Sequence, residues 1–184
     1  MELDESGDLI QAELRIKEGE KIVLRPARPE DRPLIEEMFR ACSGKTLYTR
    51  FLSPGLGVPL RYLDRLITHK PPETLSLIAL AKPGDGDRER VVGLMNFVET
   101  ESGSRGEIAI VVVDDYQNRR LGTAMLHVLY ELARARGIQN FIADIDAGNR
   151  RVFHLIQRSG LPCKISIDSG VAHAEVDMKG DLKL

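Results

Sequence analysis

The sequence predicts an α/β protein of mixed (α+β) type, in which about four or five helices flank a twisted, mostly antiparallel sheet of about six or seven strands. Two observations predict this class. Short segments of alternating apolar and polar residues, typical of strands, are interleaved with segments whose apolar residues recur at helical spacing. Near the middle of the chain three strand segments follow one another directly, which indicates an antiparallel meander. With 184 residues, of which 42% are hydrophobic, the chain can bury the core of one domain.

The first part of the chain predicts a hairpin followed by helices. Residues 9–16 alternate, and a turn joins them to a second strand over residues 21–25. A proline that suits a first helical turn, followed by apolar residues at helical spacing, predicts a helix from Pro29 to Cys42. Prolines and glycines at residues 54–59 interrupt the next segment, so residues 43–70 predict two short helices around a loop.

The second part predicts the meander, two helices and a closing hairpin. The meander strands are residues 75–82, 91–100 and 107–113, with a turn at Pro83 to Asp87. Apolar residues on one face predict a helix from Leu121 to Arg136, which Gly137 ends in a left-handed conformation. Three further elements follow: a strand (141–146), a helix (149–158, ended by Gly160) and a hairpin (164–168 with 171–178). We expect residues 20–180 to form a single domain and residues 1–19 an N-terminal extension that contributes a hairpin strand.

Composition excludes several classes of partner. The formal net charge is −2 and the pI is about 6.1, so the chain has no overall attraction to nucleic acid or to an anionic membrane. No apolar run approaches the roughly 20 residues of a membrane span. Cys42 and Cys163 show no metal-ligand spacing, so we expect two reduced, structural cysteines and no metal. Because residues 1–8 are acidic where a signal peptide would be basic, we expect a cytoplasmic protein.

The segment from Glu107 to Thr123 carries the most chemical information, because an apolar strand ends there in a basic turn that opens a helix. Backbone N–H groups at a helix start have no partner inside the helix, and the helix dipole adds roughly half a positive charge, so an anion such as phosphate is favoured. Arg119 and Arg120 add positive charge to the turn. The turn also lies at the carboxyl end of a strand, where ligands of open α/β sheets usually bind. The alternative is an ordinary charged helix start.

Two motifs resemble a known family. Residues 117–122, Gln-Asn-Arg-Arg-Leu-Gly, resemble the acyl-CoA loop of GNAT N-acetyltransferases, and the segment from Asn149 to Leu161 resembles their second CoA-contacting helix, in the family's order and spacing. The resemblance covers about residues 20 to 178 and implies a GNAT-like fold with acetyl-CoA as co-substrate. It also implies the residues that contact acetyl-CoA: the strand residues Ile110, Val111 and Val112 along the pantetheine, Gln117, Asn118, Arg119, Arg120, Leu121, Gly122 and Thr123 around the diphosphate, and Asn149 on the second helix.

Within this family the chain is most similar to the acetyltransferase domain of bacterial Pat-type protein lysine acetyltransferases. Three segments carry the likeness, namely residues 25–31, 47–53 and 106–112. The middle one, Leu-Tyr-Thr-Arg-Phe-Leu-Ser, is the most distinctive. The resemblance therefore implies that the amine acceptor is a protein lysine.

The sequence departs from the family pattern at two positions. Arg120 stands where the loop pattern has its first glycine, which weakens binding if that residue needs a positive φ angle; we expect it to lie in the first helical turn instead. Ile156 stands where many members have a tyrosine that protonates the leaving thiolate, so that role is not filled. Catalysis remains compatible with this change, because a CoA thiolate can leave unprotonated or take a proton from water.

Glu107 is the candidate general base. A lysine amine has a reference pKa near 10.4, so at pH 7 only about one in a few thousand is neutral, a handicap of roughly 4 to 5 kcal/mol. The apolar neighbours Ile108 and Ala109 and the valines beyond them are expected to raise the pKa of Glu107 by desolvation. Glu107 lies roughly 10 Å along the strand from Ile110, a distance that one glutamate and a bridging water largely span. The alternative is a strand-end carboxylate in solvent.

Other polar residues are given no firm chemistry. Asn149 suits a helix cap, which is compatible with a CoA contact. Asp144 and Asp146 are expected to be solvated strand-end carboxylates, and the four histidines are too scattered to form a catalytic pattern. Three residues of the distinctive segment either line the acceptor side or anchor the core, namely Tyr48, Arg50 and Phe51.

Three functions are compatible with these features. The first is acetyl-CoA-dependent N-acetyl transfer to a primary amine, expected to be a protein lysine, by direct attack with Glu107 as general base, in a monomer or homodimer. The second is acetylation of a small amine, which requires an enclosed acidic pocket around residues 43–66 rather than an open groove. The third is a non-catalytic acyl-CoA-binding sensor, which the residues at 120 and 156 favour.

Overall fold

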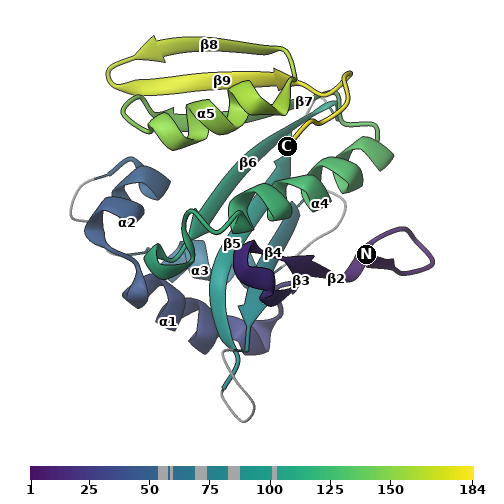
Figure 1. Ribbon diagram of the computed structural model, residues 1–184, viewed down its shortest axis with the longest axis vertical. Helices are drawn as coiled ribbons and strands as arrows, with labels where there is room; N and C mark the ends of the chain where they lie inside the picture. Colours follow the sequence, from purple (N-terminus) through teal and green to yellow (C-terminus); the bar gives the residue numbers. More distant parts are fainter. Residues whose placement is uncertain (54–57, 59, 69–73, 83–87, 101–102) are drawn as a thin grey trace.

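The computed structural model of the chain describes residues 1–53, 58, 60–68, 74–82, 88–100 and 103–184. Within these residues the strands form one nine-stranded sheet in the order β1-β2-β3-β4-β5-β6-β7-β9-β8 (Figure 1). The strands are β1 (Glu2–Leu3), β2 (Leu9–Arg15), β3 (Lys21–Pro26), β4 (Thr74–Ala81), β5 (Arg90–Glu99), β6 (Arg105–Val112), β7 (Asn140–Asp146), β8 (Cys163–Asp168) and β9 (Val171–Asp177). The α-helices are α1 (Arg32–Ala41), α2 (Gly44–Phe51), α3 (Leu60–Ile67), α4 (Leu121–Ala135) and α5 (Arg150–Ser159).

The predicted fold class is confirmed, and the sheet is larger than predicted. Over the described residues it has nine strands rather than about six or seven, because all eight expected strand segments join one sheet and the unexpected β1 adds a ninth. All neighbouring strands pair antiparallel except β6 and β7. Residues 9–15 of the expected N-terminal extension lie in the sheet as β2, paired with β3.

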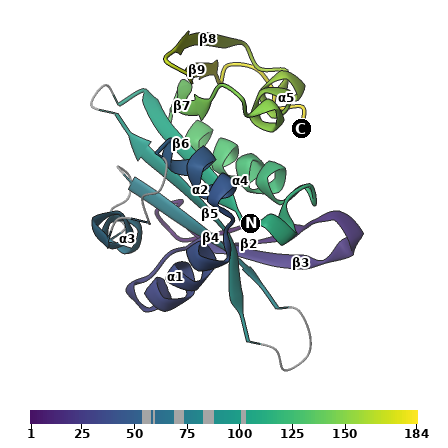
Figure 2. The same ribbon diagram turned by 90° about the vertical axis from the view of Figure 1, so that its left-hand side faces the viewer.

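Helices cover both faces of the central strands, and a further helix lies at the end of the sheet formed by β8 and β9. Figure 2 shows α1 and α3 on one side of the central strands and α4 on the other. The helix α5 lies with β8 and β9 in the upper part of Figure 1. The main core is filled from both sides, and Ile35 of α1, Leu94 of β5 and Met125 of α4 have no exposed surface. A second, smaller cluster packs Ile145 of β7 and the β9 alanines against one face of α5.

The helix boundaries follow local sequence signals. The helix expected from Pro29 begins with a 3-10 turn over Pro29–Asp31, and α1 starts only at Arg32. At the end of α4, Gly137 has a φ of 77°, a left-handed conformation that glycine adopts without strain, as predicted. None of the described helices is both long and apolar enough to cross a membrane.

The interrupted segment contains two short helices, α2 and α3, as predicted. The loop expected between them falls largely on residues 54–57 and 59, which lie outside the described residues. The same holds for the turn expected at Pro83 to Asp87.

Candidate functional site

The strands β6 and β7 pair over three residues and then diverge. Their parallel register joins Arg105, Gly106 and Glu107 to residues 140–142. Beyond Glu107, β6 continues along β5, whereas β7 continues along β9. The sheet therefore opens on one edge of β6 immediately after the candidate base. Directly before that base, no side chain fits at Gly106, because a Cβ atom there would lie 1.8 Å from the Phe97 ring.

The opened edge of β6 presents main-chain groups. The Val113 N–H donates to the Val92 carbonyl of β5 at 3.0 Å. Because successive residues of a strand direct their backbone groups to opposite sides, Val111 faces β5 as well, while Ile110 and Val112 direct theirs to the edge that β7 leaves. The Val111 side chain is buried in the core. Donors and acceptors thus lie along the edge to which the resemblance assigns pantetheine.

The turn that follows β6 has an unusual backbone. Asn118 and Arg120 have φ angles of 61° and 66°, and Arg120 is the residue before α4 begins at Leu121. Our expectation that Arg120 lies in the first helical turn is therefore wrong: the turn needs the left-handed conformation that the family's glycine supplies. A non-glycine residue in this conformation costs about 1–2 kcal/mol. Tertiary contacts must hold the turn in place.

The helix start itself leaves space for a ligand. Leu121 is buried in the core, where it anchors α4. A Cβ atom at Gly122 would have Val112 Cγ2, at 4.0 Å, as its nearest neighbour within 4 Å. Thr123 is half-buried, while the side chains of Asn118 and Arg120 are exposed. The first turn of α4 therefore combines N–H groups that have no helical partner with open space beside the β6 edge.

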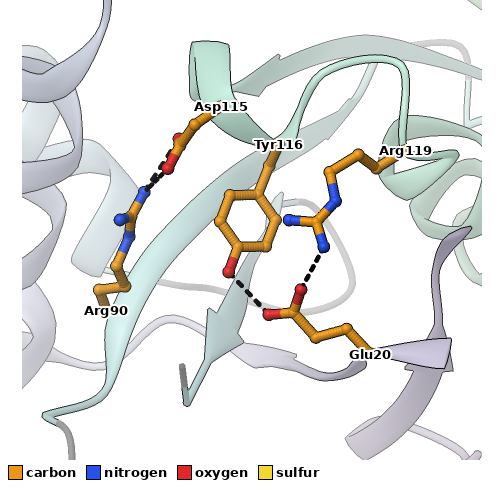
Figure 3. Close-up of polar contacts among 5 residues, drawn as sticks. All are labelled: Glu20, Arg90, Asp115, Tyr116 and Arg119. Carbon is orange, nitrogen blue, oxygen red and sulfur yellow. Dashed lines mark hydrogen bonds and ion pairs between the residues drawn. The ribbon is translucent and has the colours of Figure 1, made fainter. Parts of the chain in front are cut away.

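Arg119 does not point its charge into this space. Its guanidinium forms an ion pair with Glu20 at 2.5 Å and lies 4.6 Å from the centre of the Tyr116 ring (Figure 3). The backbone carbonyl of Arg119 also accepts from the Lys17 N–H at 2.9 Å. Of the two arginines expected to attract phosphate, only Arg120 has an exposed side chain. Sequence reasoning missed Glu20, which lies outside every motif.

Gln117 connects three elements around the opening. Its Nε2 donates to the Val112 carbonyl and to the Thr46 hydroxyl of α2, both at 3.0 Å. Its Oε1 accepts from Arg151 of α5 at 2.5 Å. The sequence analysis singled out neither Thr46 nor Arg151, although Arg151 lies in the segment that resembles the second CoA-contacting helix. Both lie beside the candidate diphosphate turn, and Arg151 brings a cation to it from the far side.

Asp114 fixes α2 against the same loop. Its carboxylate accepts hydrogen bonds from the backbone and side chain of Ser43 and from the Thr46 hydroxyl, at 2.8 to 2.9 Å. Burial tends to raise the pKa of Asp114, but the hydrogen bonds from Ser43 and Thr46 outweigh it and lower the pKa. Asp114 therefore stays ionised and holds the start of α2 beside the end of β6.

Asn149 and Ile156 both have structural roles on α5. The Asn149 side chain caps the helix by accepting from the Val152 N–H at 3.4 Å. Ile156 packs in the small apolar cluster between α5, β7 and β9. The position where many family members have a tyrosine therefore contributes packing here.

Glu107 is exposed, which corrects the expectation that apolar neighbours bury it. Successive strand residues point to opposite faces, so the side chain of Ile108 lies across the sheet from Glu107. On its own face Glu107 is paired with Val98, itself 43% exposed, and is followed by the small Ala109. The carboxylate stands in solvent at the point where β6 and β7 separate.

The distinctive segment of α2 mainly anchors the core. Phe51 contacts the Tyr62 ring edge-on at 5.2 Å between centroids. The Arg50 guanidinium lies 5.1 Å from both rings and donates to the Tyr62 hydroxyl and to Asn96. Burial raises the pKa of Tyr62. Tyr48, in contrast, is 41% exposed.

The remaining polar residues form no further centre in the described part of the chain. His173 pairs with Asp144 at 2.6 Å on an exposed face of the sheet. Among the described residues, no three histidine, cysteine, aspartate or glutamate side chains lie close enough together to hold a metal ion. Cys42 is buried, and burial raises its pKa to about 11.

Three comparisons place the chain among known proteins. Residues 21–162 match the Acetyltransferase (GNAT) domain. An acetyltransferase of Pseudomonas aeruginosa is 27% identical over 135 residues, which are 73% of this chain and 72% of the relative. The acetyltransferase Pat of Mycolicibacterium smegmatis is 28% identical over 169 residues, 90% of this chain but only 48% of Pat. This chain thus spans about half the length of that relative.

The fold has close structural counterparts. The GNAT domain of S. lividans PAT superposes with a TM-score of 0.80 at 22% identity, over 91% of this chain and 96% of that domain. This likeness supports the same arrangement of sheet and helices. The family match over most of the chain shows that this protein is an acetyltransferase of the GNAT family.

Proposed function

We propose that this protein transfers the acetyl group of acetyl-CoA to a lysine amine of another protein, with Glu107 as the general base. The observation that carries the proposal is the divergence of β6 and β7 at Glu107. An exposed carboxylate, an open strand edge and a helix start therefore follow one another along one segment of the chain. The similarity to Pat supports a protein lysine as acceptor.

The donor fits the groups along this segment. The edge of β6 offers backbone groups at Ile110 and Val112 to the pantetheine amides, and the N–H groups at the start of α4 suit the diphosphate. Gln117 occupies the Val112 carbonyl here, so a pantetheine amide that binds it replaces that contact. An N–H near Val112 is suited to stabilise the oxyanion that forms on the thioester.

The acceptor side is open. Glu107 pairs with Ile142 of β7, which pairs with Glu175 of β9, so these three side chains share one face of the sheet. An open hollow of about 390 Å³ lies over β7, β9 and β8 and includes Ile142 and Glu175 in its lining. An exposed carboxylate beside an open hollow suits a lysine on a protein surface better than a small amine that needs enclosure.

The chemistry needs two protons removed from the amine nitrogen and one bond exchanged. Glu107, through a water, takes a proton from the lysine ammonium, and the neutral amine attacks the thioester carbonyl. The carbon–sulfur bond then breaks, and the CoA thiolate leaves without a proton from position 156, where Ile156 has none to give. The attacking nitrogen gives up its second proton to water, and water passes a proton to the thiolate, so that the amide and neutral CoA remain.

The role of Glu107 is tested by Glu107→Gln, with Glu131→Gln on the exposed face of α4 as the matched control. We expect the rate at pH 7 to fall about 100-fold, the lower end of the range for general bases, and the deficit to shrink toward pH 9 as the amine loses its own proton. A rate that Glu107→Gln leaves unchanged between pH 6 and 9 removes Glu107 as the base.

The acceptor is tested by mass spectrometry of a lysate incubated with the protein and isotopically labelled acetyl-CoA. Label on protein lysines supports the proposal, whereas label only on small amines identifies a small-molecule acetyltransferase. A sensor module remains the competing function, because Ile156 and Arg120 both depart from the family pattern. CoA binding without thiol release in any lysate or amine mixture favours that function.

A further inference from the structure

Glu20 lies in the turn between β2 and β3, far in sequence from the site, yet its carboxylate contacts the loop that precedes α4 (Figure 3). We propose that Glu20 is a positioning residue for donor binding: through Arg119 and Tyr116 it fixes the turn of residues 117–120 that receives the diphosphate of acetyl-CoA. This inference rests on the proposed function, because it takes the turn as the diphosphate site.

The turn does not hold its shape through local preferences. Asn118 and Arg120 are both left-handed, and neither is glycine. Arginine in particular gains nothing locally from this conformation, whereas asparagine tolerates it. A loop with two non-glycine residues in the left-handed conformation keeps that conformation only where contacts from other parts of the fold hold it.

Glu20 supplies such contacts with both carboxylate oxygens. Oε2 pairs with Arg119 Nη2 at 2.5 Å, and Oε1 accepts from the Tyr116 hydroxyl at 2.7 Å. The side chains of Glu20 and Arg119 are each only 23% exposed, so water and salt screen the pair less than a surface ion pair. On the same β2–β3 turn, the Lys17 N–H donates to the Arg119 carbonyl. The β2–β3 turn therefore contacts Arg119 through both its side chain and its backbone.

The Tyr116 ring completes the support. It is 6% exposed and lies between two guanidinium groups, 4.6 Å from that of Arg119 and 5.3 Å from that of Arg90. Arg90 in turn holds Asp115 through both carboxylate oxygens, at 2.7 and 2.9 Å. Figure 3 shows Glu20 joined to both Tyr116 and Arg119, with the Arg90–Asp115 pair on the other side of the ring. Loss of Glu20 therefore removes a contact to Tyr116 and a contact to Arg119 at once.

Glu20 also decides how the diphosphate is bound. Since Glu20 compensates the charge of Arg119, the anion meets backbone N–H groups and the exposed cations Arg120 and Arg151 instead. Hydrogen bonds from backbone N–H groups require donor–acceptor distances near 2.7–3.2 Å, so they depend on a fixed turn. Without Glu20, the Arg119 guanidinium still lies against the Tyr116 ring, and its solvent-screened charge adds little to the binding of the anion. Removal of Glu20 is therefore expected to weaken binding despite the added positive charge.

The test compares two ligands, three variants and one control variant. CoA binding is measured by calorimetry, and binding of pantetheine, which lacks the diphosphate, is measured by NMR. We expect Glu20→Gln to raise the Kd of CoA about tenfold, the size of one lost charge-assisted hydrogen bond, and to leave the Kd of pantetheine unchanged. Arg119→Leu is expected to give a similar loss, and the double variant no more than either single one. Glu13→Gln, an exposed partner of Lys21 on the same hairpin, is the control and should change neither Kd.

Each outcome decides a different question. Wild-type protein that fails to bind CoA overturns the proposed function and this inference together. Wild-type protein that binds CoA, with Glu20→Gln binding it equally well, overturns only the inference. Loss of pantetheine and CoA binding in equal proportion also overturns it, because a general weakening of the fold affects both ligands. Should Glu20→Gln unfold, Glu20→Asp, which keeps the charge on a shorter side chain, is measured in the same way: an unchanged Kd for CoA counts against the inference and a selective rise supports it.

Discussion

Gln117 and Arg151 meet across the space between β6 and α5, where Oε1 of Gln117 accepts a hydrogen bond from Nη1 of Arg151 at 2.5 Å. Gln117 belongs to the turn before α4, and Arg151 to the first turn of α5, which Asn149 caps. The two segments whose sequences resemble CoA-contacting elements are thus in direct contact. The contact puts a second exposed cation, besides Arg120, beside the candidate diphosphate site.

Arg151→Ala is predicted to raise the Kd of CoA about tenfold, because a phosphate contact from a charged donor is worth about 1.5–3 kcal/mol. Calorimetry at low salt measures the effect, which should diminish as salt screens the interaction. Arg158→Ala, at the other end of the same helix, is the control. Equal losses of CoA affinity in both variants would indicate that the charge of α5 acts at long range, rather than through a contact between Arg151 and a phosphate.

Arg120→Gly is predicted to stabilise the fold by about 1 kcal/mol, because glycine relieves the left-handed strain at this position. Denaturant unfolding measures the change in the free energy of unfolding. Ala124→Gly, one turn into α4, is the matched control and should destabilise by up to about 1 kcal/mol. A loss of stability at both positions would mean that Arg120 contributes contacts that outweigh its backbone strain.

Gly106→Ala is predicted to destabilise the protein by about 1–3 kcal/mol, because the added Cβ would overlap the Phe97 ring and force core side chains to move. The companion change Phe97→Leu should recover part of the loss, since it removes the atoms that clash. Unfolding of the single and double variants gives the coupling between the two positions. Additive losses would contradict the predicted clash.

The ion pair between Arg25 and Asp31 is predicted to make stability depend on pH. Burial tends to raise the pKa of Asp31, but hydrogen bonds from Arg25, at 2.7 Å to each oxygen, and from the Arg28 backbone lower this pKa below its ordinary value. A lowered folded-state pKa stabilises the protein above the unfolded value, and this contribution is lost as pH falls through the folded pKa. Asp31→Asn should therefore cost about 3 kcal/mol at pH 7.

The difference in stability between wild type and Asp31→Asn should narrow below about pH 4, where an aspartate in the unfolded chain takes up its proton. Urea unfolding at pH 7, 5 and 3 measures it. Glu89→Gln, which removes an exposed partner of Lys82, should change stability by less than about 1 kcal/mol throughout. A difference that stays constant down to pH 3 would show that the Asp31→Asn substitution acts through something other than the lost charge.

Much of the fold was predictable because it depends on local signals. The helix α4 and its end at Gly137 follow from the spacing of apolar residues and one glycine. The strand β1 was not predicted, since Glu2 and Leu3 are too few for alternation to be recognised. The likeness to Pat over residues 25–31 also has a physical basis, because the Arg25–Asp31 pair joins β3 to the start of α1.

The candidate site was easier to predict in outline than in detail. The turn before α4 was expected from its charge and its place after a strand. Arg120 was wrongly expected in the first helical turn, although the glycine of the family pattern at this position is consistent with the positive φ angle that it has. Partners such as Glu20, 99 residues from Arg119, leave no local pattern. The expected burial of Glu107 was wrong, and its exposure matches the alternative of a strand-end carboxylate, because apolar neighbours in sequence, such as Ile108, point to the opposite face of a strand.

The separation of β6 from β7 has a consequence for how the chain can change over evolutionary time. Groups offered by the peptide backbone at positions 110 and 112 persist through any replacement that preserves an extended strand. Under the proposed function, selection for binding of the thioester acts on the path of the backbone and leaves the side chains at these two positions free to vary. Variants from a library randomised at these two positions should accordingly still use acetyl-CoA with many aliphatic replacements. They should lose this ability with proline, which alone removes a backbone N–H group.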